Sequence, residues 1–275
     1  MNRPLQLDGY LRSLKACLSP CPEVTVLFRA VKHAFLDGYR DLARQHMDVT
    51  FLPESRFDAQ VLAWAESAAP LMLFGCDDVV FRRKVSLSPA LPLICRPDII
   101  GFSLRLGKNI RFSQSDAAEI PRPPFLQRDE LLVWDWSAAE SHWGYPFELN
   151  GTVYRRDLVL GLLRGLESQR HLNAMFEWRH PNLLELRGNE LLRMVEAPPL
   201  MACFPESALV VPTVNCVQSI FDNPLLGPAM NVDELERARQ AGATVDIEAC
   251  RQRSFDRIHV GELLLEEKEP LHAAR

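Results

Sequence analysis

The sequence predicts an α/β fold with a mainly parallel central sheet flanked by helices. Helical and strand-like segments alternate from the N-terminus as far as residue 81. The helical segments carry apolar residues every three or four positions, whereas the strand-like segments are short apolar runs rich in β-branched residues. Strands separated by helices usually pair in parallel, so this order is typical of a sheet with helices on both faces.

The N-terminal elements follow one another in a regular order. Pro4 begins the first predicted helix, because proline is favoured at the first helical position. The predicted helices cover residues 5–18, 34–46 and 55–67, and the predicted strands cover residues 23–30 and 49–52, followed by a strand that begins at Pro70. A parallel α/β domain ordinarily begins with a strand, so we expect the first strand of the sheet to be missing from this chain.

The pattern after residue 81 is less regular. Strands or extended segments are predicted at residues 99–106, 131–136 and 209–217, and helices at residues 156–166 and 183–195. We expect residues 1–217 to form one domain and residues 218–275 to form a C-terminal extension packed on it.

Composition excludes several classes of protein. The 275 residues are 47% hydrophobic and 24% charged, which is ordinary for a folded globular protein. A formal charge of -5 argues against nucleic-acid binding. Seven cysteines without a C-x-x-C pair indicate neither a disulfide framework nor a structural zinc site. There is no membrane-spanning apolar run and no signal-peptide core, so we expect a cytoplasmic protein.

An acidic pair follows the strand that begins at Pro70. Asp77 and Asp78 repel each other, and packing alone does not explain why a buried strand ends in two carboxylates. Carboxylate oxygens are preferred ligands of divalent cations, which would hold a diphosphate against the sheet edge. The alternative is a solvated turn.

Aromatic residues are concentrated further along the chain, in the region of Asp135. Trp143 and Tyr145 lie beside turn-forming residues, and aromatic faces with polar groups between them suit sugar rings. The alternative is an aromatic core that holds a loop in place.

Four further residues are candidates for chemistry. Arg3 and Arg105 could bind an anionic leaving group, or could be solvated charges. His259 could be a distant metal ligand, although an ordinary hydrogen-bonded histidine is commoner. Glu185 is near the start of a predicted helix, where a carboxylate also favours the helix dipole. The chain lacks a Walker loop, a G-x-S-x-G elbow, an H-E-x-x-H motif and a Rossmann glycine fingerprint, which argues against the corresponding enzyme classes.

Five segments together resemble a known family. They are N-R-P-L-Q-L-D-G-Y-L-R-S-L (2–14), V-T-V-L-F-R-A (24–30), L-F-G-C-D-D-V-V-F (73–81), G-F-S-L-R-L-G (101–107) and W-G-Y-P-F-E-L-N-G-T-V-Y-R (143–155). In this order they resemble bacterial glycosyltransferases of the GT-A type, and more narrowly the family 2-like transferases found with surface-polysaccharide genes.

The resemblance implies a nucleotide-diphospho-sugar transferase fold. Residues 1–107 would be its nucleotide-binding half and residues 108–217 its acceptor and sugar half. Asp77 and Asp78 match the acidic motif that binds Mg²⁺ or Mn²⁺, with Asp78 as the direct ligand. A carboxylate would deprotonate the acceptor hydroxyl. Glu185 is preferred over Asp135 for this role, because H-P-N-L-L-E falls where the family carries N-P-N-x-L-E.

Two departures qualify the match, namely the missing first strand and the dissimilar residues 171–179. The expected activity is metal-dependent transfer of a sugar from a nucleotide-diphospho-sugar to a glycan or lipid-linked acceptor, in a cytoplasmic protein peripheral at the inner membrane face. One alternative is a degenerate, non-catalytic carbohydrate-binding or scaffold protein. Another is a metal-dependent nucleotidyltransferase or hydrolase.

Overall fold

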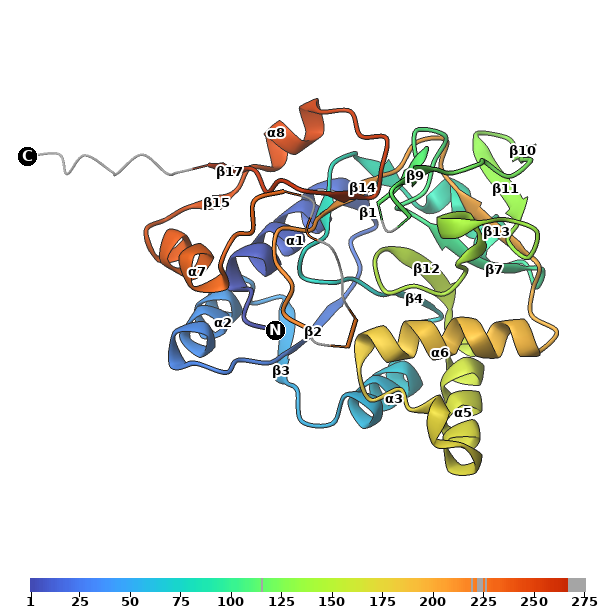
Figure 1. The fold of residues 1–275 in the computed structure, drawn as a ribbon, viewed down its shortest axis with the longest axis horizontal. Helices are drawn as coiled ribbons and strands as arrows, with labels where there is room; N and C mark the ends of the chain where they lie inside the picture. Colours follow the sequence, from blue (N-terminus) through green and yellow to red (C-terminus); the bar gives the residue numbers. More distant parts are fainter. Residues whose placement is uncertain (115, 219, 222–224, 226, 267–275) are drawn as a thin grey trace, which may run out of the picture.

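The computed structural model describes residues 1–114, 116–218, 220–221, 225 and 227–266. It shows a mixed α/β fold, in which helices surround one six-stranded sheet and several smaller sheets (Figure 1). The helices are α1 (Pro4–Cys17), α2 (His33–Gln45), α3 (Phe57–Ser67), α4 (Leu91–Ile94), α5 (Arg156–Leu172), α6 (Pro181–Met194), α7 (Val232–Gln240) and α8 (Ile247–Gln252), with short 3₁₀ helices η1 (Ser88–Ala90), η2 (Ser141–Gly144) and η3 (Ala174–Phe176).

The six-stranded sheet is mixed and mainly antiparallel. Its strands, in spatial order, are β10 (Leu126–Arg128), β11 (Leu131–Asp135), β13 (Leu200–Cys203), β7 (Ile99–Ser103), β12 (Thr152–Arg155) and β4 (Leu71–Leu73). The pair β13 and β7 is parallel, whereas the other neighbours in this sheet are antiparallel. The expectation of a mainly parallel central sheet is therefore not confirmed. Alternation along the chain indicates how strands are connected, but it does not determine which strand edges pair.

The smaller sheets join distant parts of the chain. They comprise β2 (Val24–Phe28) with β3 (Val49–Pro53), β1 (Leu18–Ser19) with β6 (Val85–Ser86), β8 (Phe112–Ser113) with β9 (Ala118–Glu119), β15 (Thr244–Val245) with β17 (Leu265–Glu266), and the trio β5 (Val80–Phe81), β14 (Leu209–Pro212) and β16 (His259–Val260). Strands β2 and β3 are parallel, as the N-terminal alternation predicts. Within the described residues, no strand connects them to the six-stranded sheet.

Most of the predicted elements are confirmed. Each predicted helix and strand overlaps one in the structure, and α5 continues beyond the predicted end to Leu172. Strands β12 and β13 were not predicted, because each is only four residues long and depends on pairing with β7.

Helix α1 is a central helix rather than a surface helix. Its leucines Leu5, Leu7, Leu11 and Leu14 are all buried, and so are several of its polar side chains. Gly9 allows close packing, because a Cβ there would lie 2.5 Å from a methyl group of Val245. The C-terminal segments therefore lie against the N-terminal helix, as the orange-red and blue ribbons show (Figure 1).

Helices α5 and α6 pack beside each other below the sheet (Figure 1). Buried Asn189 on α6 accepts a hydrogen bond from the Phe147 amide at 3.1 Å and donates one to the Phe147 carbonyl at 2.6 Å. This clamp fixes the loop before β12 against α6, and this loop carries part of the candidate site.

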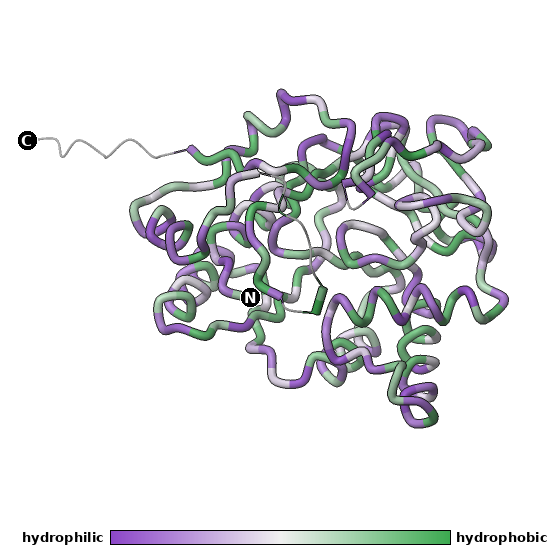
Figure 2. The backbone as a smooth tube through the Cα atoms, viewed as in Figure 1, coloured by the Kyte–Doolittle hydropathy of each residue, from purple (hydrophilic) through white to green (hydrophobic). Residues whose placement is uncertain are grey.

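The distribution of hydropathy agrees with this packing. Hydrophobic segments run through the middle of the molecule, and hydrophilic segments lie mostly at its periphery (Figure 2). Among the described helices, none is both long and apolar enough to cross a membrane.

Candidate functional site

The acidic pair lies in a tight turn between β4 and β5. The amide of Val79 donates to the carbonyl of Cys76 at 3.3 Å, and this bond closes a turn with Asp77 and Asp78 at its centre. Their side chains are 19% and 15% exposed, so both carboxylates are largely removed from water. The structure thus does not show the solvated turn that was the alternative.

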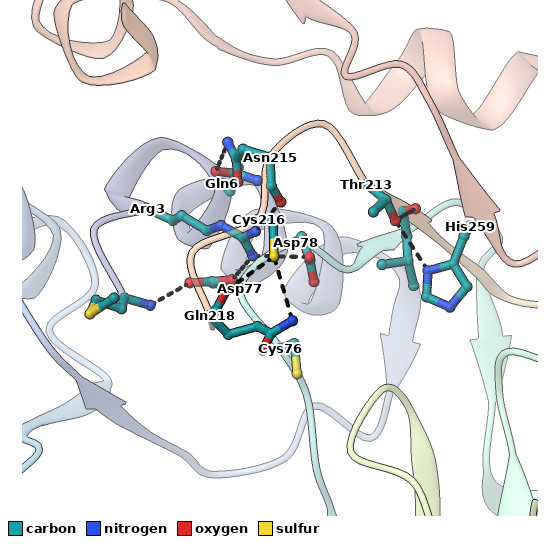
Figure 3. A network of polar contacts seen from close by, with 12 residues as sticks. Arg3, Gln6, Cys76, Asp77, Asp78, Thr213, Asn215, Cys216, Gln218 and His259 are labelled. Atoms are coloured by element: carbon teal, nitrogen blue, oxygen red, sulfur yellow. Dashed lines mark hydrogen bonds and ion pairs between the residues drawn. The ribbon is translucent and has the colours of Figure 1, made fainter. Parts of the chain in front are cut away.

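Arg3 occupies the space between the two carboxylates. Its Nη1 lies 2.9 Å from Asp77 Oδ1 and 3.0 Å from Asp78 Oδ2, and its Nη2 donates to the Asn215 carbonyl at 2.6 Å (Figure 3). The backbone of Arg3 is held as well, because its amide donates to the Tyr39 hydroxyl at 3.1 Å. Arg3, which the sequence made a candidate for binding an anionic leaving group, therefore lies at the acidic pair.

The two aspartates differ in their ionisation. Burial tends to raise the pKa of Asp77, but the Met1 ammonium, 3.2 Å away, and Arg3 outweigh it and hold that pKa below its ordinary value. Burial raises the pKa of Asp78, and the charge of Asp77 adds to this effect against the opposing charge of Arg3. One carboxylate is therefore held firmly ionised while its neighbour retains a proton more readily.

Glu185 forms the second part of the site. It lies in α6, and its Oε1 accepts a hydrogen bond from the Leu149 amide at 2.6 Å. Burial raises the pKa of Glu185 to about 7, with Glu148 and Asp78 acting in the same direction and the Leu149 hydrogen bond opposing them. A carboxylate with this pKa can accept a proton at neutral pH and release it again.

Arg105 and Glu148 lie close enough to Glu185 for their charges to act on it. Both are buried, and Arg105 Nε is 3.6 Å from Glu148 Oε2. In the described part of the chain, Arg105 Nε and Nη2 and Glu148 Oε1 have no hydrogen-bond partner. Sequence reasoning identified Arg105 but missed Glu148, although a carboxylate between Phe147 and Leu149 in an apolar run is a recognisable signal.

A short backbone segment connects the two parts of the site. The amide of Leu149 binds Glu185, and its carbonyl lies 3.7 Å from the Cys76 thiol, directly before the acidic pair. Burial raises the pKa of Cys76 well above its ordinary value, and the charges of Asp78 and Glu185 both add to this rise. Asp77, Asp78 and Glu185, which are far apart in the sequence, therefore belong to one electrostatic environment.

Comparison with known proteins identifies one relevant similarity. The chain is similar to the bifunctional glycosyltransferase pgtA of Dictyostelium discoideum. The two are 25% identical over an alignment of 293 residues, which covers 96% of this chain and 38% of the Dictyostelium protein. The chain thus spans less than half the length of that relative. No family model matches the sequence.

The two predicted sugar-binding aromatics lie in different environments. Trp143 is fully buried, with ring centroids of Trp134 and Phe125 at 5.0 and 5.3 Å. This packing favours the alternative interpretation, an aromatic core that holds a loop in place. Tyr145 is half-buried, and burial raises the pKa of its hydroxyl, with Glu185 acting in the same direction. Tyr145 therefore lies near the candidate base, whereas Trp143 supports the loop from inside.

His259 and Asp135 do not join the acidic pair. His259 Nδ1 lies 3.1 Å from Thr213 Oγ1, and burial together with the charge of Arg105 lowers its pKa to about 4. The described residues contain no cluster of three potential metal ligands, so His259 does not complete a site with Asp77 and Asp78. Asp135 is exposed, and its carboxylate accepts two hydrogen bonds from Ser137, at 2.9 and 2.7 Å.

The acidic pair fits a divalent cation that is shared with a substrate. Arg3 binds only one oxygen of each carboxylate, which leaves Asp77 Oδ2 and Asp78 Oδ1 as hard oxygen donors. Mg²⁺ and Mn²⁺ prefer such oxygens and commonly take their remaining ligands from phosphates and water. Asp77 and Asp78 would hold such an ion, and Asp77 Oδ2 would exchange its contact with the Met1 ammonium.

Proposed function

We propose that this protein is a metal-dependent glycosyltransferase of the GT-A type that uses a nucleotide-diphospho-sugar donor. The observation that carries the proposal is that Glu185, with a pKa of about 7, shares one half-buried site with Asp77 and Asp78. The 25% identity to a glycosyltransferase over nearly the whole chain supports sugar transfer. A glycan or lipid-linked acceptor in surface-polysaccharide synthesis, reached at the inner membrane face, is the finer part of the proposal.

The chain's own residues perform three tasks in the proposed reaction. Glu185 accepts the proton of the acceptor hydroxyl while the hydroxyl oxygen bonds to the anomeric carbon of the donor. The bond between that carbon and the diphosphate oxygen breaks, and Arg3 and Arg105 stabilise the negative charge of the departing nucleoside diphosphate. A bound divalent ion would supply further charge neutralisation at the diphosphate.

Calorimetry followed by product analysis tests the proposal. Uridine and guanosine diphosphates are titrated with Mn²⁺ present, and the corresponding nucleotide-sugars are then incubated with glycan and lipid-linked acceptors. We expect nucleotide binding that depends on Mn²⁺, and a glycosylated product. Release of free sugar without transfer would indicate a hydrolase, and absence of binding to any nucleotide would exclude the proposed activity.

One observation favours a second candidate, a protein that binds a nucleotide-sugar without turnover. The guanidinium of Arg3 already neutralises the acidic pair by contacts to both carboxylates. This candidate would be favoured over the enzyme if the protein bound a nucleotide-sugar tightly but formed no product with any acceptor. Glu185→Gln should then bind the nucleotide-sugar as the wild type does.

A further inference from the structure

Arg3 places a positive charge between the two carboxylates that would hold a metal ion. A single nitrogen, Nη1, lies within 3.0 Å of an oxygen from each aspartate. The side chain is only 8% exposed, so the guanidinium is not a solvated charge that approaches the pair by chance. It acts as an internal cation, because Nη1 holds Asp77 Oδ1 and Asp78 Oδ2, and its charge would repel a divalent ion held by the two other oxygens, Asp77 Oδ2 and Asp78 Oδ1.

Arg3 also has capacity for another anion. Its Nε is buried and has no hydrogen-bond partner among the residues that the structure describes. Burial opposes the charged form of Arg3, but Asp77 and Asp78 outweigh burial and raise its pKa, so the guanidinium remains charged. A buried charged group with an unused donor gains free energy when an anionic oxygen reaches it. A diphosphate oxygen has this chemistry.

Charge balance shows when the guanidinium would move. The two aspartates, Arg3 and the Met1 ammonium together carry no net charge. A divalent cation alone would give this group two positive charges, and a nucleotide-sugar diphosphate alone would give it two negative charges. Both ligands together restore neutrality. The low dielectric of a partly buried site penalises each of the unbalanced states.

We propose that Arg3 is a positioning residue that couples metal binding to donor binding at this site. Without donor, Arg3 holds the two carboxylates and weakens their affinity for a divalent cation. When the donor binds, the guanidinium transfers from the aspartates to the diphosphate, which would remove its repulsion from the carboxylates that hold the cation. No covalent bond changes in this exchange. The inference rests on the proposed function, and it adds that the donor and metal bind cooperatively.

The inference is tested by Mn²⁺ binding, which is measured from the spin-resonance signal of free Mn²⁺ with and without saturating uridine or guanosine diphosphate. In the wild-type protein we expect the nucleotide to raise Mn²⁺ affinity by about tenfold or more, within the usual range of coupling between sites. Arg3→Gln should bind Mn²⁺ alone about tenfold more tightly than wild type, and the nucleotide effect should fall to about threefold or less.

Arg82→Gln is the matched control. Arg82 is also a buried arginine, with Nη2 at 2.6 Å from Glu206 and Nη1 at 3.2 Å from the Arg253 carbonyl. Its Nε, like that of Arg3, has no hydrogen-bond partner among the described residues. Arg82 contacts neither Asp77 nor Asp78, so the Mn²⁺ affinity of Arg82→Gln should match that of the wild type. If Arg3→Gln does not fold, Arg3→Lys replaces it, because a lysine keeps the charge but cannot reproduce the planar guanidinium contacts. Its metal affinity without nucleotide should exceed that of the wild type.

The outcomes separate this inference from the proposed function. If wild type binds nucleotide and Mn²⁺ independently, or if Arg3→Gln binds Mn²⁺ alone no better than wild type, the coupling role is wrong while the transferase proposal stands. If no nucleoside diphosphate binds with or without Mn²⁺, both fail.

Discussion

The raised pKa of Glu185 leads to a quantitative prediction for Glu185→Gln. The carboxyl has an ordinary pKa of 4.5 and a folded-state pKa of about 7. Each pKa unit is worth about 1.4 kcal/mol, so ionising Glu185 in the folded protein costs about 3 kcal/mol relative to the unfolded chain. The folded protein therefore holds this proton more tightly than the unfolded chain, and this group makes the wild type lose stability as pH rises from about 4.5 to about 7.

Glutamine at position 185 cannot ionise, and its side-chain oxygen can still accept the hydrogen bond of the Leu149 amide. We expect the variant and the wild type to be about equally stable near pH 4.5, and the variant to be more stable by up to about 3 kcal/mol at pH 8. The same variant should lose about 10²-fold to 10⁴-fold in transfer rate, because the proton acceptor is gone.

Urea unfolding of both proteins at pH values between 4.5 and 8 measures this difference. Glu190→Gln, on the same helix, is the control, because the Glu190 side chain is 40% exposed and pairs with Arg187 at 2.7 Å. A stability difference between wild type and Glu185→Gln that stays constant across this pH range would refute the reasoning about the buried carboxyl.

Three further predictions concern the parts around this group. Asp78→Ala should weaken Mn²⁺-dependent nucleotide binding by about tenfold or more in calorimetry, and full binding by this variant would show that the metal site is elsewhere. Asp98→Ala, which removes a partly exposed carboxylate bound to Arg96, should leave this binding unchanged. Asn189→Ala should destabilise the protein by about 2–3 kcal/mol in urea unfolding, because the Phe147 amide and carbonyl lose their buried partner. A change below about 0.5 kcal/mol would show that these two hydrogen bonds do not hold the loop against α6. Gly75→Ala should lower the free energy of unfolding by about 1–3 kcal/mol, because the new Cβ would overlap the Tyr10 hydroxyl beside the acidic turn. An unchanged urea midpoint would show that Tyr10 moves freely.

Local sequence patterns were sufficient for the elements whose stability is mainly local. Helix α1 follows from Pro4 and the leucine spacing, and the acidic turn follows from the change between an apolar strand and two carboxylates. Pairing directions were not predictable in this way. Strand β12 joins β7 and β4 in antiparallel pairs, and no property of its four residues specifies either neighbour.

The candidate site shows the same contrast between what the sequence determines and what the tertiary structure decides. The sequence by itself made Asp77 and Asp78 candidates, because two carboxylates directly follow an apolar strand, and it made Glu185 a candidate through the resemblance of H-P-N-L-L-E to the family motif. Only the tertiary structure decided that Arg3 contacts Asp77, 74 residues further along the chain, and that the charge of Glu148 acts on Glu185. It also decided that Trp143 is enclosed by other rings. Burial and pairwise charge set these properties, and both depend on which distant segments the fold brings together.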